Sequence, residues 1–470
     1  MYQQQIEAYF HSAEHRQQML DAIVRLCRIP SEKGSPMPGK PYGEGPAAAL
    51  GEALKLAQEL GFPVKNYDNY VGAVDLCDKA PRLDILAHLD VVPAGEGWTV
   101  TEPFAPLVVG DRIYGRGTAD DKGPAICALF AMKAVKDLGI PLSGNCRLIL
   151  GCDEECGSSD IRHYYAQEPE APMTFSPDAD FPVINTEKGS LHSPFTAQFS
   201  AGETLPRIYS VECGVKVNVV PGTAKAVLEG ISAEETREYT DAVTMDTGVE
   251  FQVLEQDAKT VVTAVGTSGH AAMPENANNA LTALLELLSR MPFAPCEGLE
   301  RIQAIHQMFP HGDYYGENAG VAMEDFSGKL TISLNMLHYD LTSLKGVYDC
   351  RASLCATDNT LRDVLMARFA KASIQMEDTP MNPAHHVPED SPFIQALLRC
   401  YQQYTGEPGR CIAIGGGTYV HHLKNGVAFG CSKIGVDNHM HGVDEFAETS
   451  QLLLSAKIFT QAIIELCAQP

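Results

Sequence analysis

Histidine and acidic side chains come shortly after three apolar runs in this chain. His88 and Asp90 follow LDILA, Glu154 and Glu155 follow CRLIL, and Asp178 follows MTF. Residues two apart on an extended segment point to the same side, so Asp90 could accept the second N–H of a metal-bound His88 imidazole. Adjacent residues point opposite ways, so one glutamate could bind a metal while its neighbour acts as a base. Each cluster alone is equally consistent with a solvated turn.

Two further clusters extend this set of nitrogen and oxygen donors. A glycine-rich stretch, residues 115–124, carries Asp120 and Asp121 ahead of a predicted helix. Either carboxylate could cap that helix, and one carboxylate could also bridge two metal ions. His441 lies in the run 438–445. Histidine and carboxylate donors without sulfur suit zinc, or manganese or cobalt in a two-metal site.

A scaffold must bring these clusters together. The apolar runs 83–87, 147–150 and 173–175 predict buried strands, and residues 124–138 predict a helix between the first two. Alternating strands and helices indicate an α/β fold with a mainly parallel sheet covered on both faces. Ligands of such sheets sit beyond the carboxyl ends of the strands, which is where the polar clusters fall. Residues 6–27 predict a single amphipathic helix ahead of this sheet.

The middle of the chain breaks this alternation. Strand-like runs at 224–228, 260–265 and 329–337 mix with helical runs at 277–289 and 361–372. We therefore predict a catalytic domain over residues 1–188 and 386–470, interrupted over 189–385 by a lid domain of one or two α+β units, with two favoured. The total of 470 residues fits two or three domains.

Composition excludes several classes of partner and location. Lys plus Arg total 35 and Asp plus Glu total 60, so the net charge of −25 argues against nucleic acids and anionic membranes as partners. No apolar run reaches the ~18 residues of a membrane span. The first residues, MYQQQIEAYFHSAEHRQ, lack a signal-peptide pattern, and the 14 cysteines sit singly in mostly apolar runs. A reducing, cytoplasmic location is the expectation.

In the order of its motifs, the chain resembles the family of aminoacylases, carnosinases and dipeptidase V-like metallopeptidases. The motifs that carry the resemblance are HLD, GRGTADDKGP, CDEECGS, SPDADFP, NVVPG, SGHAAMPENA, GGGTY and HGVDE, and it extends from about residue 10 to 465. The long insertion and GGGTY look most like the dipeptidase V branch of bacterial Xaa-His dipeptidases. The resemblance implies a zinc-exopeptidase-type catalytic domain with an inserted lid, and metal-dependent hydrolysis of dipeptides.

The resemblance also implies a role for individual residues. It implies two divalent ions, with zinc favoured over manganese or cobalt, and the ligands His88 and Asp178 for one, Glu155 and His441 for the other, and a bridging Asp120. Glu154 is implied as the general base and Asp90 as the partner of His88. Lid residues Asn218 and His270 would stabilise an oxyanion. Substrate binding is implied for Arg351, which would grip the terminal carboxylate, and for Gly416, Gly417 and Thr418.

Several alternatives stay open at this point. The same water-activating residues would serve an N-acyl amino acid amidohydrolase or a carboxypeptidase. An inactive peptide-binding protein and a single-metal structural protein are other possibilities. Val420 and His421 follow GGGTY where the branch often has Ala and a basic residue, which leaves the side-chain preference open. The length of the lid favours a functional monomer, because one chain could then supply its own lid histidine.

Overall fold

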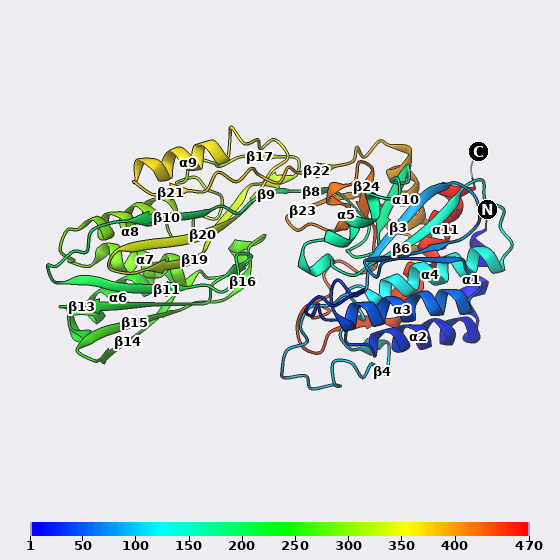
Figure 1. Ribbon diagram of the computed structural model, residues 1–470, viewed down its shortest axis with the longest axis horizontal. Helices are drawn as coiled ribbons and strands as arrows, with labels where there is room; N and C mark the ends of the chain where they lie inside the picture. The colour runs from blue at the N-terminus through cyan, green and yellow to red at the C-terminus, as the bar shows by residue number, and fades with distance from the viewer. Residues whose placement is uncertain (1, 469–470) are drawn as a thin grey trace. The chain divides into compact units, whose positions relative to one another are not determined.

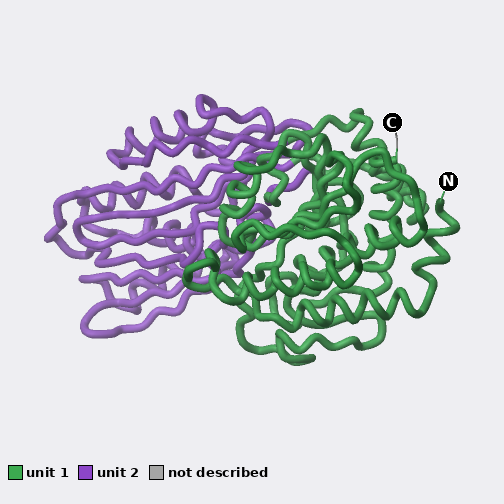
Figure 2. The backbone as a smooth tube through the Cα atoms, turned by 45° about the vertical axis from the view of Figure 1, so that its right-hand side comes forward, with its two compact units in different colours: residues 1–186, 386–412, 417–470 green, residues 187–385, 413–416 purple. Residues whose placement is uncertain are grey.

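Two hydrophobic cores divide the chain, which the computed structural model describes over residues 2–468 (Figures 1 and 2). Unit 1 comprises residues 1–186, 386–412 and 417–470, and unit 2 comprises residues 187–385 and 413–416. The chain passes from unit 1 to unit 2 after residue 186 and returns after residue 385, and the sequence-based borders fall after residues 188 and 385. The return of residues 413–416 to unit 2 was not expected.

Unit 1 is built on a sheet whose centre is parallel and whose outer pairs are antiparallel. Strand β3 pairs in parallel with β6 and β7, and β7 with β24, whereas β1–β2, β2–β6 and β24–β8 are antiparallel. The sheet is therefore mixed rather than mainly parallel. The order along this path is β1 (Val64–Tyr67), β2 (Val71–Asp75), β6 (Asn145–Gly151), β3 (Pro81–His88), β7 (Met173–Ser176), β24 (Gly426–Ala428) and β8 (Val183–Glu187).

Helices cover both faces of this sheet. The larger core lies under α1 (Gln3–His11), α2 (Ala13–Cys27), α3 (Glu44–Glu59), α4 (Lys122–Asp137), α10 (Pro392–Thr405) and α11 (Thr449–Cys467). The smaller core lies under α5 (Ser159–Tyr165) and the 3₁₀ turn η3 (Tyr419–His422). Helix α4 is buried around most of its circumference, because it contacts the sheet, α2 and α11. The helix expected over residues 6–27 is two helices, since Ser12 has extended backbone.

The strand ends of unit 1 meet at one edge. His88 is the last residue of β3 and pairs with Gly151, the last residue of β6. Beside the main sheet, β25 (Phe446–Glu448) pairs with β5 (Arg112–Tyr114), which pairs with β4 (Leu107–Val109). This small sheet joins the segment after His441 to the segment before Asp120.

Unit 2 contains one nine-stranded sheet over one large core. Neighbouring strands of this sheet all pair antiparallel. Its strands are β14 (Glu250–Gln256), β15 (Lys259–Val265), β13 (Thr223–Glu229), β11 (Arg207–Cys213), β19 (Thr331–Tyr339), β20 (Ser343–Ala352), β10 (Pro194–Gln198) and β21 (Gln375–Met376), with β9 (Gly189–Leu191) beside β20.

Four helices accompany this sheet: α6 (Ala233–Thr247), α7 (Ala280–Arg290), α8 (Glu297–Met308) and α9 (Arg362–Lys371). Helix α6 starts at a capping box between Ser232 and Glu235, and Asn279 caps α7. Helix α7 packs on β13, β15 and β19. None of the helices within residues 2–468 combines the length and apolar character that a bilayer crossing needs.

We expect Phe459 to be a critical core residue of unit 1. Its ring is fully buried and lies 5.3 Å from that of Phe175 and 6.0 Å from that of Phe429, so Phe459→Ala leaves a cavity below β7 and β24. The free energy of unfolding should fall by about 3–5 kcal/mol. Urea unfolding monitored by circular dichroism tests this, with Met245→Ala at an 87% exposed position as control. Equal stability of the two variants would contradict the packing described here.

Candidate metal centre

The five predicted metal ligands all belong to unit 1, where they gather at the carboxyl edge of its sheet. They are His88 at the end of β3, Asp120 in the loop before α4, Glu155 in the 3₁₀ turn η1 (Glu154–Cys156) after β6, Asp178 after β7, and His441 in the loop before β25. Distances of 2.8–3.5 Å link them into one group.

Asp120 lies at the middle of this group. Its Oδ1 is 2.8 Å from His88 Nε2, and its Oδ2 is 2.8 Å from His441 Nε2. His88 Nε2 also lies 3.5 Å from Asp178 Oδ2, and His441 Nε2 lies 3.1 Å from Glu155 Oε1. One carboxylate thus stands between two histidines, each with a second acid beside it. This arrangement of donors suits two cations that share a carboxylate.

Buried donor atoms without hydrogen bonds indicate that the group fits cations. Among the described residues, His88 Nε2, Asp120 Oδ1 and Glu155 Oε1 are buried and make no hydrogen bond of acceptable geometry. Donor atoms of His88, Asp120 and Glu155 lie within 4.8 Å of one another, and so do donor atoms of His88, Glu154 and Asp178. Unpaired buried polar atoms are costly, and a metal ion is a partner for all of them at once.

The pKa shifts distinguish the acids of the group. Burial raises the pKa of Asp120, but the adjacent imidazoles of His441 and His88 outweigh this and leave it well below its usual range. The hydrogen bond to Asp120, and then the nearby Glu155 carboxylate, raise the pKa of His441 to about 10. Burial raises the pKa of Glu154 well above its usual value, opposed by His88 and reinforced by Asp178 and Glu155. Glu154 is thus suited to accept a proton.

Asp90 contacts His88 differently from the sequence-based expectation. His88 Nδ1 donates to the backbone oxygen of Asp90 at 2.9 Å, whereas the Asp90 carboxylate is 3.5 Å away. That carboxylate instead accepts the backbone N–H groups of Glu154 and Glu155, both at 3.2 Å. Asp90 therefore fixes the His88 ring through its main chain and the two glutamates through its side chain.

Two more acids support the turn that carries Glu154 and Glu155. Asp160 accepts the backbone N–H groups of Cys152 and Asp153 and the hydroxyl of Tyr419. Asp153, the first acid of the CDEEC run, accepts from Ser159 and pairs with Lys33. Sequence reasoning missed Asp160, and the only local signal was its place at the start of a helix.

Glu445 is the other functional residue that the sequence did not single out. Its Oε1 accepts the backbone N–H groups of Gly117 and Ala119, both at 3.0 Å, and of Asp120 at 3.3 Å. Its Oε2 accepts from the buried Arg116, which also donates to the backbone oxygen of Gly442 at 3.0 Å. Glu445 therefore joins the loop of Asp120 to the loop of His441. The other histidine of that loop, His439, lies 3.2 Å from the backbone oxygen of Val443.

The remaining predicted site residues divide between the units. In unit 2, Asn218 accepts the N–H of Ala271 through its backbone oxygen at 3.0 Å, next to the pairing of β12 (Val219–Val220) with β16 (Gly269–His270). Asn218 and His270 are thus neighbours. Arg351 on β20 and Gly416 also belong to unit 2, whereas Gly417 and Thr418 belong to unit 1. The roles of these residues stay predictions.

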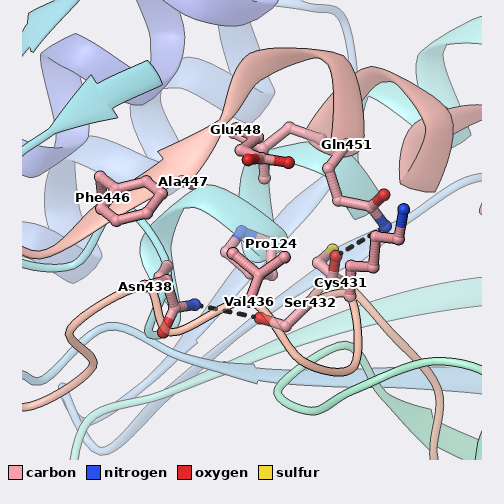
Figure 3. A pocket seen from close by; sticks show the side chains of 12 residues that line it. Pro124, Cys431, Ser432, Val436, Asn438, Phe446, Ala447, Glu448 and Gln451 are labelled. Atoms are coloured by element: carbon pink, nitrogen blue, oxygen red, sulfur yellow. Dashed lines mark hydrogen bonds between the residues drawn. The ribbon is translucent and has the colours of Figure 1, made fainter. Parts of the chain in front are cut away.

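A small cavity of unit 1 adjoins the Asp120 loop but is separate from the ligand group (Figure 3). Ala119 and Pro124 line it together with Cys431 and Phe446. The two hydrogen bonds drawn there run from Asn438 to Ser432 Oγ at 3.3 Å and from Gln451 to the backbone oxygen of Cys431 at 3.0 Å. None of the five predicted ligands is among its lining residues, so this cavity is not the metal centre.

The position of Glu445 predicts the effect of Glu445→Gln. The amide replaces a charged acceptor of three backbone N–H groups and leaves Arg116 without its buried counter-charge. The affinity for zinc should fall about 10–100-fold, which is typical of outer-shell partners. Competition with a chelating dye measures this, and Glu448→Gln, three residues further along, is the control. Unchanged affinity in Glu445→Gln would show that the loop of Asp120 holds its position without Glu445.

Comparison with known proteins shows which family this chain is similar to. The profile of peptidase family M20/M25/M40 matches residues 85–465. The Bacillus subtilis (strain 168) protein named "Putative dipeptidase YtjP" is 35% identical over 91% of this chain and 92% of its own length. The Beta-Ala-Xaa dipeptidase of Lactobacillus delbrueckii subsp. lactis is 32% identical over 91% of this chain and 90% of its own length.

Solved structures share the fold at low sequence identity. Human carnosine dipeptidase 1 superposes with a TM-score of 0.60 at 14% identity, over 99% of both chains. Aminoacylhistidine dipeptidase from Vibrio alginolyticus gives a TM-score of 0.60 at 14% identity, over 98% of both chains. With the profile spanning most of its length and relatives above 30% identity across nine-tenths of it, the chain belongs to peptidase family M20/M25/M40.

Proposed function

We propose that this protein is a metal-dependent dipeptidase, which hydrolyses the peptide bond of dipeptides that carry a free terminal carboxylate. The observation that carries the proposal is Asp120 between His88 and His441, with the partly buried Glu154 beside the group. The relatives above 30% identity are named as dipeptidases, which supports this substrate class.

The ligand group suits two divalent ions, and zinc fits its mixture of imidazole and carboxylate best, with manganese or cobalt as substitutes. His88 and Asp178 would hold one ion, His441 and Glu155 the other, and Asp120 would bridge them. When bound, such ions supply Lewis acidity that polarises the scissile carbonyl and acidifies a water molecule.

The side chains of the protein supply the proton transfers and the orientation. Glu154 takes the proton of the attacking water and passes it to the leaving amine, which its raised pKa favours. Asp90 keeps Glu154 and Glu155 in place through their backbone N–H groups. Asn218 and His270 are proposed to donate to the developing oxyanion, and Arg351 to the terminal carboxylate of the substrate.

The adjacent glutamates provide a matched test of these roles. We expect Glu154→Gln to retain both metal ions and lose activity about 10²–10⁴-fold, because only the base is removed. Glu155→Gln should instead lose affinity for one ion. Metal content by mass spectrometry and kcat on a dipeptide separate the two effects. Normal turnover by Glu154→Gln, or equal loss of metal from both variants, would refute the assignment.

A substrate panel tests the activity itself. Dipeptides, tripeptides and N-acetyl amino acids are assayed after removal of metal by EDTA and again after addition of zinc, manganese or cobalt. We expect no turnover without metal and, with metal, release of amino acids from dipeptides only. Cleavage of N-acetyl amino acids at the same rate would make the protein an amidohydrolase. Cleavage of tripeptides at their carboxyl end would make it a carboxypeptidase, and no cleavage would leave a binding protein.

A further inference from the structure

Arg351 is held by an acid two residues before it on the same strand of unit 2. Asp349 Oδ1 accepts from Arg351 Nε at 2.7 Å, and Asp349 Oδ2 accepts from Arg351 Nη2 at 3.0 Å. Arg351 Nη1 donates to the backbone oxygen of Gly415 at 2.9 Å. These three bonds fix the plane of the guanidinium between β20 and residues 413–416, which belong to the same unit.

The N–H groups of Arg351 that make none of these bonds determine what the side chain can bind. A guanidinium has one N–H on Nε and two on each terminal nitrogen. Bonds to Asp349 use the N–H of Nε and one of Nη2, and Gly415 uses one of Nη1. One N–H on each terminal nitrogen remains, and such a pair matches the two oxygens of a carboxylate. Since Asp349 occupies the edge of the guanidinium between Nε and Nη2, the edge between the two terminal nitrogens is the one left for a second carboxylate.

Asp349 is itself held from another side. Its side chain is fully buried, and His192 Nε2 lies 3.0 Å from its Oδ2. Burial raises the pKa of Asp349, but the neighbouring His192 and Arg351 outweigh this and lower it. A buried carboxylate held by a guanidinium and flanked by an imidazole is ionised and fixed in position. It offsets the charge of Arg351, so recognition here depends on hydrogen-bond geometry more than on net charge.

We propose that Asp349, supported by His192, is a positioning residue that sets the specificity of the enzyme for peptides with a free terminal carboxylate. The inference rests on the proposed dipeptidase function and deepens it. Asp349 does not touch the substrate. It holds the guanidinium of Arg351 so that one bidentate edge stays available. The asparagine of Asp349→Asn cannot do so, because its amide nitrogen is a donor and would face one of the two Arg351 donors.

The test compares a dipeptide with its C-terminal amide on the full, zinc-loaded enzyme. The measured quantity is the ratio of kcat/KM for the free dipeptide to that for the amide. In Asp349→Asn this ratio should fall about tenfold or more, mostly through a raised KM for the free dipeptide. Arg351→Lys should lower it as well, since an ammonium lacks the fork.

Two further variants separate positioning from folding. Asp340 lies in the turn between β19 and β20, where its carboxylate accepts the backbone N–H groups of Thr342 and Ser343. Asp340→Asn should leave the ratio unchanged. His192→Gln, at a part-exposed site, should shift the ratio in the direction of Asp349→Asn by about two- to fivefold, and serves if Asp349→Asn does not fold.

The outcomes separate this inference from the proposed function. A wild type that hydrolyses no dipeptide overturns the proposed function and the inference with it. An active wild type whose ratio is unchanged in a folded Asp349→Asn overturns the inference alone. An equal loss of kcat on both substrates also overturns it, because a general structural defect would have that effect.

Discussion

The concentration of negative charge at one edge of the unit 1 sheet is the constraint on which the structure depends. Asp90, Asp120, Asp121, Glu154, Glu155 and Asp178 meet there beside the imidazoles of His88 and His441, and most of the surface of these acids is inaccessible to water. Such a group is stable only if every carboxylate has donors or cations to pair with. Backbone N–H groups supply many of these donors. Asp90 accepts two of them, and the adjacent acids Asp160 and Glu445 accept others from the same loops.

This constraint explains why loops rather than regular elements carry most ligands. A backbone N–H can point at a carboxylate only where it is not used in a helix or sheet ladder. The glycine-rich turn before α4 and the short η1 turn release such groups, and buried acids then hold them in a fixed shape. The loops of the centre are thus held in shape by Asp90, Asp160 and Glu445, which would bind no metal. The residues that fix the geometry therefore differ from those that would coordinate the ions.

Much of this could be predicted from the sequence, because the signals are local. His88, Glu155 and Asp178 come at or after predicted strands, Asp120 comes before a predicted helix, and the order of the motifs that contain them and His441 identified the family. The partners of the loops could not be predicted, since Arg116 and Glu445 lie 329 positions apart and meet only in the folded chain. Strand pairing in unit 2 is non-local for the same reason, so the number of its α+β units stayed open in the sequence. The break at Ser12 left no trace in the apolar periodicity.

The division of the chain has a consequence for how the protein is made. Residues 413–416 complete unit 2, and α11, which ends at Cys467, completes the core of unit 1. The core of unit 2 lies within residues 191–376 and can therefore form before α11 has left the ribosome. The core of unit 1 cannot close until α11 has emerged, so its apolar surface stays exposed while all of unit 2 is synthesised, a state in which molecular chaperones can act.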